Sequence, residues 1–278
     1  MTALRARASH DEAATIGRRA TQALQNEVAT YPKPGLVSHV DNGAHADMDH
    51  ALLHGSAATL EPYFAELAAA GAAAATMDRL RAIGIAAERA MLDATQGVNT
   101  HRGAIFGMGL LCAAAGFRHL YAPAQPLGRL VVALWSGDIL AGPVELRSHG
   151  AEVARKHGAG GARMEAATGF PSLYNHALPA LVEGQRLAPL DPEAARVHAC
   201  MHLIGAVEDT NLLYRGGPDG LAFARTLANR FLAEGGVGDP TWRDKAVLVH
   251  QAFVARNLSP GGCADLLAMA LFAQEMGE

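Results

Sequence analysis

Apolar positions recur at helical spacing along most of this chain. Ile16, Ala20, Leu24 and Val28 follow one another at intervals of four, and similar runs return to the end of the sequence. The pattern predicts helices over about residues 9–30, 47–70, 76–95, 104–116, 127–139 and 191–214, followed by two or three more. Only the apolar run at residues 131–135 resembles a strand. We therefore expect an all-α, single-domain bundle of nine to eleven helices spanning residues 1–278, with residues 1–8 flexible.

Several helix boundaries carry their own signals. Ser9-His10-Asp11-Glu12 has the form of a capping box, and Pro32 should end the first helix by Tyr31. Pro62 is expected to kink or restart the second helix. Asp191-Pro192-Glu193 is typical of a helix start, and this helix should run to about Tyr214.

A long polar segment, residues 31–49, interrupts the helical pattern. It has no clear period and contains Pro34-Gly35, a pair suited to a type II turn. Loops of this length inside a compact domain are usually functional. We expect this loop and several helix ends to form the active-site pocket.

Composition narrows the classes of protein that remain. Half of the 278 residues are hydrophobic but only 5% are aromatic, and the abundance of alanine favours close helix packing. A net charge of −4 argues against nucleic-acid binding. The three cysteines lie far apart in apolar runs, as buried free thiols do in a reducing compartment. No signal peptide and no uninterrupted apolar run long enough to cross a membrane are evident, so we expect a soluble, cytoplasmic protein whose alanine-rich surface is compatible with a homodimer.

The segment from Gly97 to Phe106 places a polar cluster at the start of an apolar helix. Asn99, His101 and Arg102 would stand where free N–H groups and the helix dipole favour an anion. The alternative is a capping turn with Asn99 or Thr100 as the cap.

Two further groups of acids suggest metal or proton chemistry. The long loop carries His45, Asp47 and Asp49 beside Lys33 and Asn42, a set that suits magnesium and polyphosphate. A solvated helix cap with surface acids is the alternative.

In the helix expected from Asp191, Glu208, Asn211 and Arg215 fall at i, i+3 and i+7 and would share one face, with Asp209 beside them. An exposed face with a structural Glu–Arg pair is the alternative.

The segment Ser259-Pro260-Gly261-Gly262 predicts a helix start with a serine cap and proline at the first position. Its glycines expose backbone N–H groups to a second anion, and Asp265 lies one turn further on, where it would accept a proton or bind metal. Helix-start preferences alone do not call for both glycines.

Two other features favour no particular chemistry. His198 and His202 are four residues apart, but the glutamate of a zinc protease is missing after the first histidine, so a core or surface pair is the better interpretation. The glycine-rich stretch 158–169 is expected to be mobile or to touch substrate, but it fits no phosphate-loop pattern. The residues by themselves indicate a helical enzyme that handles phosphates or nucleotides.

Four blocks of the sequence carry a resemblance to a known family. In chain order they are YPKPGLVSHVDNGAHADMD, GVNTHRGAIFGMGLL, VEDTNLLYRGG and NLSPGGCADLLA. Together they resemble the signature blocks of the triphosphoribosyl-dephospho-coenzyme A synthase family, over about residues 27–269. One departure is Arg102, where the family leads us to expect lysine. Arginine places a planar guanidinium with several N–H donors at this position, whereas lysine would place a single compact positive charge there.

The resemblance implies a pentosyltransferase that joins ATP to 3′-dephospho-coenzyme A with loss of adenine, using ATP as substrate and Mg²⁺. It implies that the product passes to a transferase that modifies an acyl carrier protein, of malonate decarboxylase by our preference or of citrate lyase. Under this hypothesis the substrate-binding residues are Lys33, Asn42, His45, Asn99, Arg102, Asn211, Arg215, Ser259, Gly261 and Gly262. The catalytic candidates are Glu208, Asp209, His101 and Asp265, and the metal candidates are Asp47, Asp49 and Glu208.

Two alternatives come from other classes. An ADP-ribose-type glycohydrolase would bind magnesium around a ribose and need no dephospho-coenzyme A. A non-catalytic scaffold would bind ATP without turnover.

Overall fold

The computed structural model describes residues 2–143, 153, 156 and 160–278. These residues form eleven α-helices, one short π-helix and one 3₁₀ turn, and no strand. The first half contains α1 (Thr2–Val28), α2 (His50–Ala72), α3 (Met77–Ala94), α4 (Arg102–Tyr121) and α5 (Leu127–Ala141). The second half contains α7 (Gly161–Ala167), η1 (Leu173–Ala177), α8 (Leu178–Leu187), α9 (Pro192–Ala206), α10 (Thr210–Ala233), η2 (Gly236–Gly238), α11 (Trp242–Val254) and α12 (Gly261–Glu275). The all-α prediction is confirmed.

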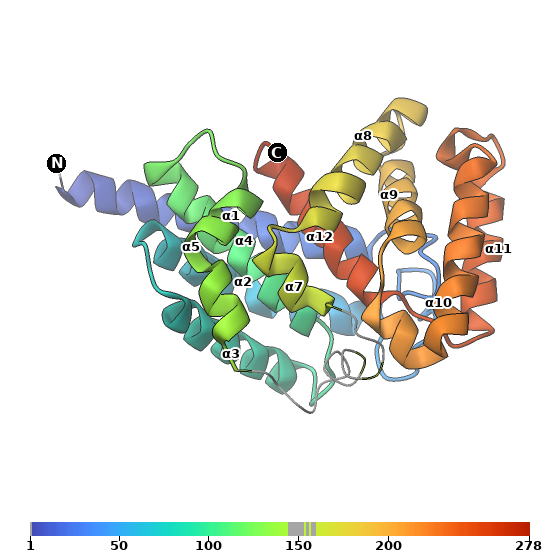
Figure 1. The fold of residues 1–278 in the computed structure, drawn as a ribbon, viewed down its shortest axis with the longest axis horizontal. Helices are drawn as coiled ribbons and strands as arrows, with labels where there is room; N and C mark the ends of the chain where they lie inside the picture. Colours follow the sequence, from blue (N-terminus) through green and yellow to red (C-terminus); the bar gives the residue numbers. More distant parts are fainter. Residues whose placement is uncertain (1, 144–152, 154–155, 157–159) are drawn as a thin grey trace.

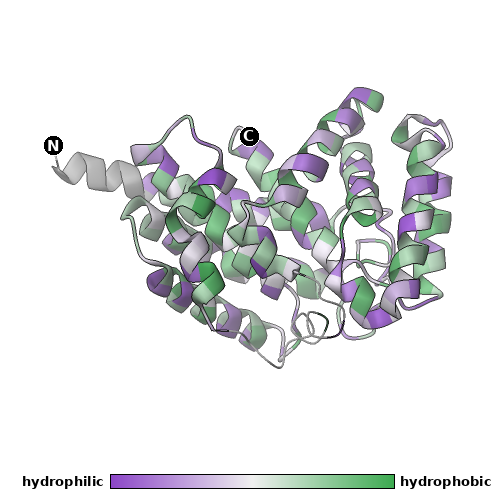
Figure 2. Ribbon diagram, in the orientation of Figure 1, coloured by the Kyte–Doolittle hydropathy of each residue, from purple (hydrophilic) through white to green (hydrophobic). Residues whose placement is uncertain are grey.

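Helix α4 lies at the centre of the bundle. It contacts α1, α2, α3, α5, α7 and α12, and twelve of its residues, from Ala104 to Gly116, are buried. By length and composition α4 is apolar enough to cross a membrane, but 67% of its most apolar window is covered by the rest of the protein. That burial is typical of the core helix of a globular domain. The outer helices α3 and α11 instead show alternating hydrophilic and hydrophobic turns (Figure 2).

Small residues let α2 and α4 approach each other closely. A Cβ atom added to Gly71 would stand 1.9 Å from the carbonyl oxygen of Ala113, and one added to Gly116 would stand 1.9 Å from that of Ala68. The contact is therefore backbone against backbone at two points. The prediction that the alanine-rich composition serves close helix packing is confirmed.

The predicted long loop connects α1 to α2 and folds against the far end of the chain. Lys33 O accepts a hydrogen bond from Leu36 N at 3.2 Å, and Gly35 has φ +68°, which confirms the predicted type II turn. A Cβ on Gly35 would lie 2.0 Å from Leu258 O, so only glycine permits the loop to pack against the connection before α12. This contact brings the loop to the N-terminal end of α12.

Three predicted boundaries are wrong. Helix α1 begins at Thr2 rather than at the capping box of Ser9, because residues 2–8 are good helix formers. Helix α2 continues through Pro62 without restarting. The helix expected from Asp191 to Tyr214 is interrupted at Val207–Asp209, where Asp209 caps a new helix, α10. The end expected after Tyr214 is present as a kink in α10 at Gly217, whose φ of 62° and ψ of −165° are not helical.

The structure also shows where part of the glycine-rich stretch and the three cysteines lie. Residues 158–159 of the stretch lie outside the described residues, and residues 161–167 form α7. Cys112, Cys200 and Cys263 are buried free thiols, as predicted.

Candidate active site

A large cavity opens where the N-terminal ends of α4, α10 and α12 meet the loop between α1 and α2. Its volume is about 1150 Å³. This volume slightly exceeds the range of about 300–1,000 Å³ that is typical of sites for one drug-sized ligand. The predicted site residues that line it are Lys33, His45, Asn99, His101, Arg102, Glu208, Asp209, Asn211, Arg215, Ser259, Gly261, Gly262 and Asp265. The prediction of a pocket formed by helix ends and the long loop is therefore confirmed.

Asp209 joins two of the three helix ends. Its Oδ1 accepts hydrogen bonds from Asn211 N at 2.8 Å and Leu212 N at 3.0 Å and so caps α10, while its Oδ2 accepts one from Cys263 N at 2.8 Å in α12. The residue is only 2% exposed. Burial raises the pKa of the carboxyl, and the hydrogen bonds from the backbone oppose that rise. Both oxygens are engaged, which suits a structural tie between helices.

Packing explains the two glycines at the start of α12, which helix-start preferences alone did not explain. A Cβ on Gly262 would stand 3.0 Å from Asp209 Oδ2, and one on Gly261 would stand 2.7 Å from the side-chain amide of Asn211. The two glycines therefore let the N-terminal ends of α10 and α12 lie side by side. The helix begins one residue later than predicted, with Pro260 at the cap position and Gly261 first in the helix.

Asp265 extends from the second turn of α12 to the N-terminal end of α4. A Cβ on Gly103 would stand only 2.0 Å from Asp265 Oδ2. The Asp265 carboxyl also interacts with the backbone N–H of Ala104. Burial, followed by the negative charges of Glu27 and Asp209, raises its pKa well above the ordinary value. Asp265 is thus a half-buried carboxyl of raised pKa in the cavity wall.

Lys33 reaches the cavity floor from the long loop and is 1% exposed. It forms an ion pair with Glu27 of α1, which the sequence interpretation did not single out. Glu27 looks like any acidic residue near a helix end, and nothing local signals its role. The pair places one positive and one negative charge beneath the cavity, so Lys33 is not an uncompensated cation.

His101 stands at the cap position of α4 and is 4% exposed. Its Nδ1 lies 2.9 Å from Ser56 Oγ, which in turn lies 2.7 Å from Thr100 Oγ1. Burial, together with the positive charge of Lys33, lowers the pKa of His101 to about 4. The imidazole is therefore neutral at physiological pH, and its buried Nε2 has no hydrogen-bond partner among the described residues.

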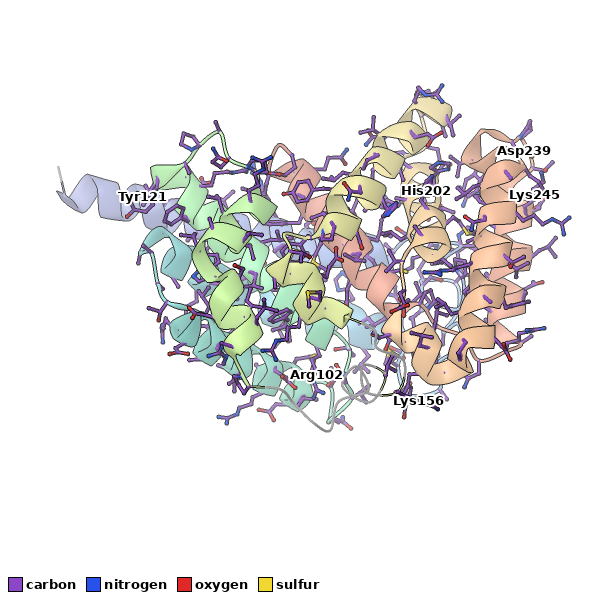
Figure 3. The ribbon with its side chains drawn as sticks, viewed as in Figure 1. Arg102, Tyr121, Lys156, His202, Asp239 and Lys245 are labelled. Atoms are coloured by element: carbon purple, nitrogen blue, oxygen red, sulfur yellow. The ribbon has the colours of Figure 1, made fainter. Side chains whose placement is uncertain are left out.

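Arg102 begins α4 at the rim of the cavity (Figure 3). Its guanidinium forms an ion pair with Glu88 of α3 at 2.6 Å. The cap position of α4 is His101 rather than the predicted Asn99 or Thr100, although Asn99 Oδ1 accepts a hydrogen bond from Arg102 N at 3.3 Å and Asn99 also lines the cavity. The anion-site and capping-turn interpretations of this segment are therefore compatible.

His45, Ser259 and Arg215 form a chain of contacts that holds the loop in place. His45 Nε2 lies 2.8 Å from Ser259 Oγ, and His45 Nδ1 lies 3.3 Å from an Arg215 nitrogen. Arg215 also donates to the carbonyl of Ala44 at 2.8 Å and to Asn257 Oδ1 at 3.0 Å. Burial and the nearby Arg215 charge lower the pKa of His45. These three residues chiefly fix the cavity wall.

The structure does not gather the expected metal ligands Asp47, Asp49 and Glu208. Asp49 Oδ1 accepts a hydrogen bond from Leu52 N at 2.8 Å and caps α2, and Asp47 lies 3.6 Å from His45 with its carboxyl 62% exposed. Neither lines the cavity, and Asn42 is exposed outside it. Glu208 lines the cavity but is exposed, because the break after α9 removes it from the helical face it was expected to share with Asn211 and Arg215. The alternative interpretation of Asp49 as a cap is the correct one.

The cavity also has a wall formed by α7 and the residues after it, where the glycine-rich stretch was expected to touch substrate. Glu165 of α7 accepts hydrogen bonds from Ser172 N at 2.7 Å and Ser172 Oγ at 2.9 Å, and burial raises its pKa. Phe106 and Phe170 supply apolar surface to the same cavity. The glycines around residue 160 were the only signal for this region.

The fold and this site define an all-α enzyme with a large cavity, which combines apolar walls, helix N-termini and a carboxyl of raised pKa. Residues 13–278 match the family described as ATP:dephospho-CoA triphosphoribosyl transferase. The chain belongs to this family, and it is a transferase.

Curated relatives agree with the family assignment. A 2-(5''-triphosphoribosyl)-3'-dephosphocoenzyme-A synthase of Pectobacterium atrosepticum is 42% identical over 266 residues, covering 91% of this chain and 86% of the relative. A probable synthase of the same name from Pseudomonas putida is 40% identical over 265 residues, covering 93% of each chain. One from Acinetobacter calcoaceticus is 36% identical over 260 residues, covering 91% of this chain and 88% of the relative. No solved structure matches the chain significantly.

Proposed function

We propose that this chain transfers the triphosphoribosyl group of ATP to the 2′-hydroxyl of 3′-dephospho-coenzyme A and releases adenine. Family membership and the relatives' names support the reaction. The observation that carries the proposal is Asp265, a half-buried carboxyl of raised pKa in a large cavity. Because the matched family transfers a group between two nucleotides, the glycohydrolase and scaffold alternatives have no support.

The reaction breaks the bond between C1 of the ATP ribose and adenine, and it forms a bond between that carbon and the acceptor's 2′-oxygen. The proton lost by the hydroxyl is balanced by the proton that adenine gains as it leaves. Positive charge develops at the sugar carbon, as in glycoside cleavage. A carboxylate beside that carbon would both take the hydroxyl proton and offset the charge.

We assign the proton-accepting role to Asp265. It is half-buried in the cavity wall, and the positive charge that develops at the sugar carbon would favour the ionised carboxylate, which can then accept the hydroxyl proton. Asp209 has both oxygens engaged by backbone N–H groups and is better suited to position α12. His101, neutral and adjacent to the cavity, is assigned to hold the adenine side of the pocket.

We assign binding of the ATP phosphates to helix N-terminal ends and to basic side chains. The first N–H groups of an α-helix have no partner within the helix, so Gly261 and Gly262 offer donors at the start of α12. Arg102 adds a positive charge at the rim, and Arg215 and Lys33 contribute from within a network of contacts. Magnesium would enter with ATP, since Mg²⁺ in nucleotide sites takes most of its ligands from phosphates and water. Glu208 lines the cavity and would supply one carboxylate ligand to the magnesium ion. The ion would neutralise part of the negative charge of the triphosphate.

The product's destination extends the proposal. We favour the acyl carrier protein of malonate decarboxylase over that of citrate lyase, on the resemblance of the block AAERAMLDATQGVNTHRGAIF, with a separate transferase attaching the product. ATP and dephospho-coenzyme A are cytoplasmic metabolites, which supports a cytoplasmic location. A homodimer remains a prediction that light scattering of the purified chain would test.

The test is to incubate the purified chain with ATP, Mg²⁺ and dephospho-coenzyme A and to measure adenine and the triphosphoribosyl product by mass spectrometry. We expect both in equal amounts, and neither when dephospho-coenzyme A is omitted. Adenosine or ADP-ribose products without the acceptor would indicate a glycohydrolase, and ATP binding without turnover would indicate a scaffold. Either outcome overturns the proposal.

Variants of the acids test the assigned roles. Asp265→Asn should lose most adenine release, and Glu208→Gln should raise the Mg²⁺ concentration needed for half-maximal rate. If Asp265→Asn retains full activity, the base lies elsewhere. Supplying the product to each acyl carrier protein system would separate the malonate and citrate destinations.

A further inference from the structure

A cluster of metal-binding side chains lies away from the active-site cavity, between α8 and α9. We propose that Glu183, His198 and His202 form a binding site for a zinc-class divalent cation. The candidate ligand atoms of the three residues all lie within 4.8 Å of one another. None of the three lines the active-site cavity, and Figure 3 shows His202 well separated from Arg102 at the cavity rim.

The spacing of the cluster suits coordination better than a hydrogen bond. His198 Nε2 and Glu183 Oε2 are 3.5 Å apart. Charge-assisted hydrogen bonds of this kind are about 2.7–2.9 Å long. Two ligands of one tetrahedral zinc ion, each about 2.1 Å from the metal, are separated by about 3.4 Å. An ion between the two atoms would therefore need little movement of either side chain.

His198 supplies an observation that is independent of the spacing. Its side chain is 4% exposed, and neither ring nitrogen has a hydrogen-bond partner among the described residues. Buried polar atoms are normally satisfied, and an absent ion is one of the standard reasons for an exception. A Cβ on Gly236 would stand 2.8 Å from His198 Nδ1 and Cε1, so the backbone of η2 closes off that edge of the ring. The Nε2 edge, which lies nearest Glu183, is the one left for a ligand.

The two helices hold the three residues in place. His198 and His202 are one turn apart on α9, with ring centroids 5.7 Å apart, and Glu183 comes from α8, which packs against α9. Glu183 is 47% exposed, so an ion has access from solvent.

The donor set determines the class of cation. Two imidazoles and one carboxylate suit zinc and neighbouring transition metals, whereas Mg²⁺ and Ca²⁺ prefer all-oxygen sites. Three protein ligands leave a fourth position for water. The missing glutamate after His198 had argued against a zinc-protease motif, but it does not bear on a site whose carboxylate comes from another helix. Bound metal would clamp α8 to α9.

The experiment uses the full chain after treatment with a chelator and dialysis. Zn²⁺ is titrated in competition with a chromogenic chelator, and thermal unfolding is followed with and without Zn²⁺. Co²⁺ provides a spectroscopic probe, since four-coordinate Co²⁺ with nitrogen ligands absorbs in the visible range. We expect one Zn²⁺ per chain, an increase in Tm on Zn²⁺ addition, and visible Co²⁺ bands.

Glu183→Gln and His202→Asn should weaken Zn²⁺ binding by at least about 10–100-fold, the range already seen when residues behind the ligands are changed. They should also abolish the Tm increase. His119→Asn, a change of an exposed histidine on α4, is the matched control and should bind Zn²⁺ like the unchanged chain. Glu183→Gln alters an exposed side chain, so its result does not depend on the folding of a core variant. Equal Zn²⁺ affinity in the unchanged chain and both variants, or less than about one-tenth of an equivalent bound, would overturn the site.

Discussion

The carboxylate of Asp265 lies against the α-carbon of Gly103, so that a Cβ on Gly103 would stand 2.0 Å from Asp265 Oδ2. The two residues are far apart in the sequence and come from the second turn of α12 and the first turn of α4. No side chain larger than hydrogen at residue 103 leaves this carboxylate where it is. The glycine after Arg102 is thus part of the arrangement of the candidate base.

Gly103→Ala should therefore displace Asp265 and lower kcat by about 100-fold, the loss expected when a catalytic group moves by about 1 Å. Steady-state kinetics of adenine release would measure it. Gly137→Ala is the control, because a Cβ there meets nothing within 4 Å and α5 gains a better helix former. If Gly103→Ala and Gly137→Ala have equal kcat, the position of Asp265 does not matter to the chemistry.

Substitutions of Asp209 and Asp265 should have different effects on stability and on activity. Asp209→Asn replaces one acceptor oxygen with a donor, and any orientation of the amide sets it against a backbone N–H of α10 or α12. We expect this variant to lose about 1–3 kcal/mol of unfolding free energy in urea. Asp265→Asn removes a carboxyl that burial already disfavours in its charged form, so it should lose little stability but most activity. The reverse order of stabilities would contradict the assignment of Asp209 as the tie between α10 and α12.

Arg102→Ala should raise the KM for ATP by about 10-fold, equivalent to about 1.4 kcal/mol, because it removes a positive charge from the rim of the cavity. Arg79→Ala is the matched control. Arg79 also forms a 2.6 Å ion pair, with Glu66, but it does not line the cavity. An unchanged KM for ATP in Arg102→Ala would mean that residues 97–106 serve only to start α4.

His101 should make stability depend on pH. Its pKa is about 4 in the folded protein and about 6.5 when unfolded, so between these values the unfolded chain binds the extra proton. Unfolding free energy should therefore fall as the pH is lowered from 6.5 to 4, by about 3 kcal/mol from this residue. Urea unfolding of the unchanged chain and of His101→Gln across this range would isolate the effect, since the other histidines are present in both. Parallel curves would show that His101 is not buried in its neutral form.

The local sequence determined most of the secondary structure. Periodic apolar positions predicted the helices, and Pro34-Gly35 predicted the turn that the hydrogen bond from Leu36 to Lys33 forms. Boundaries were less certain, because a capping signature such as Ser9 competes with the helix propensity of the residues before it. The break at Val207–Asp209 was missed because it contains no proline or glycine, and the nearest glycine, Gly205, lies within the last turn of α9.

The candidate site was only partly visible in the sequence. The four polar blocks do line one cavity, because each contains a helix start or the loop packed against these starts. The sequence did not indicate which residue in these blocks has which chemical role. Asp49 and Asp265 look alike as acids near a predicted helix start, yet one caps α2 outside the cavity and the other faces Gly103 inside it.

The sequence by itself determined an all-α chain, its polar segments and the family to which these segments belong. Only the tertiary structure decided that Glu27 pairs with Lys33, that Asp209 joins α10 to α12, and that Glu183 meets the histidines of α9. The reason is physical. Helix formation depends on residues within a few positions of one another, whereas the burial and charge that set a carboxyl's role come from neighbours brought together by packing.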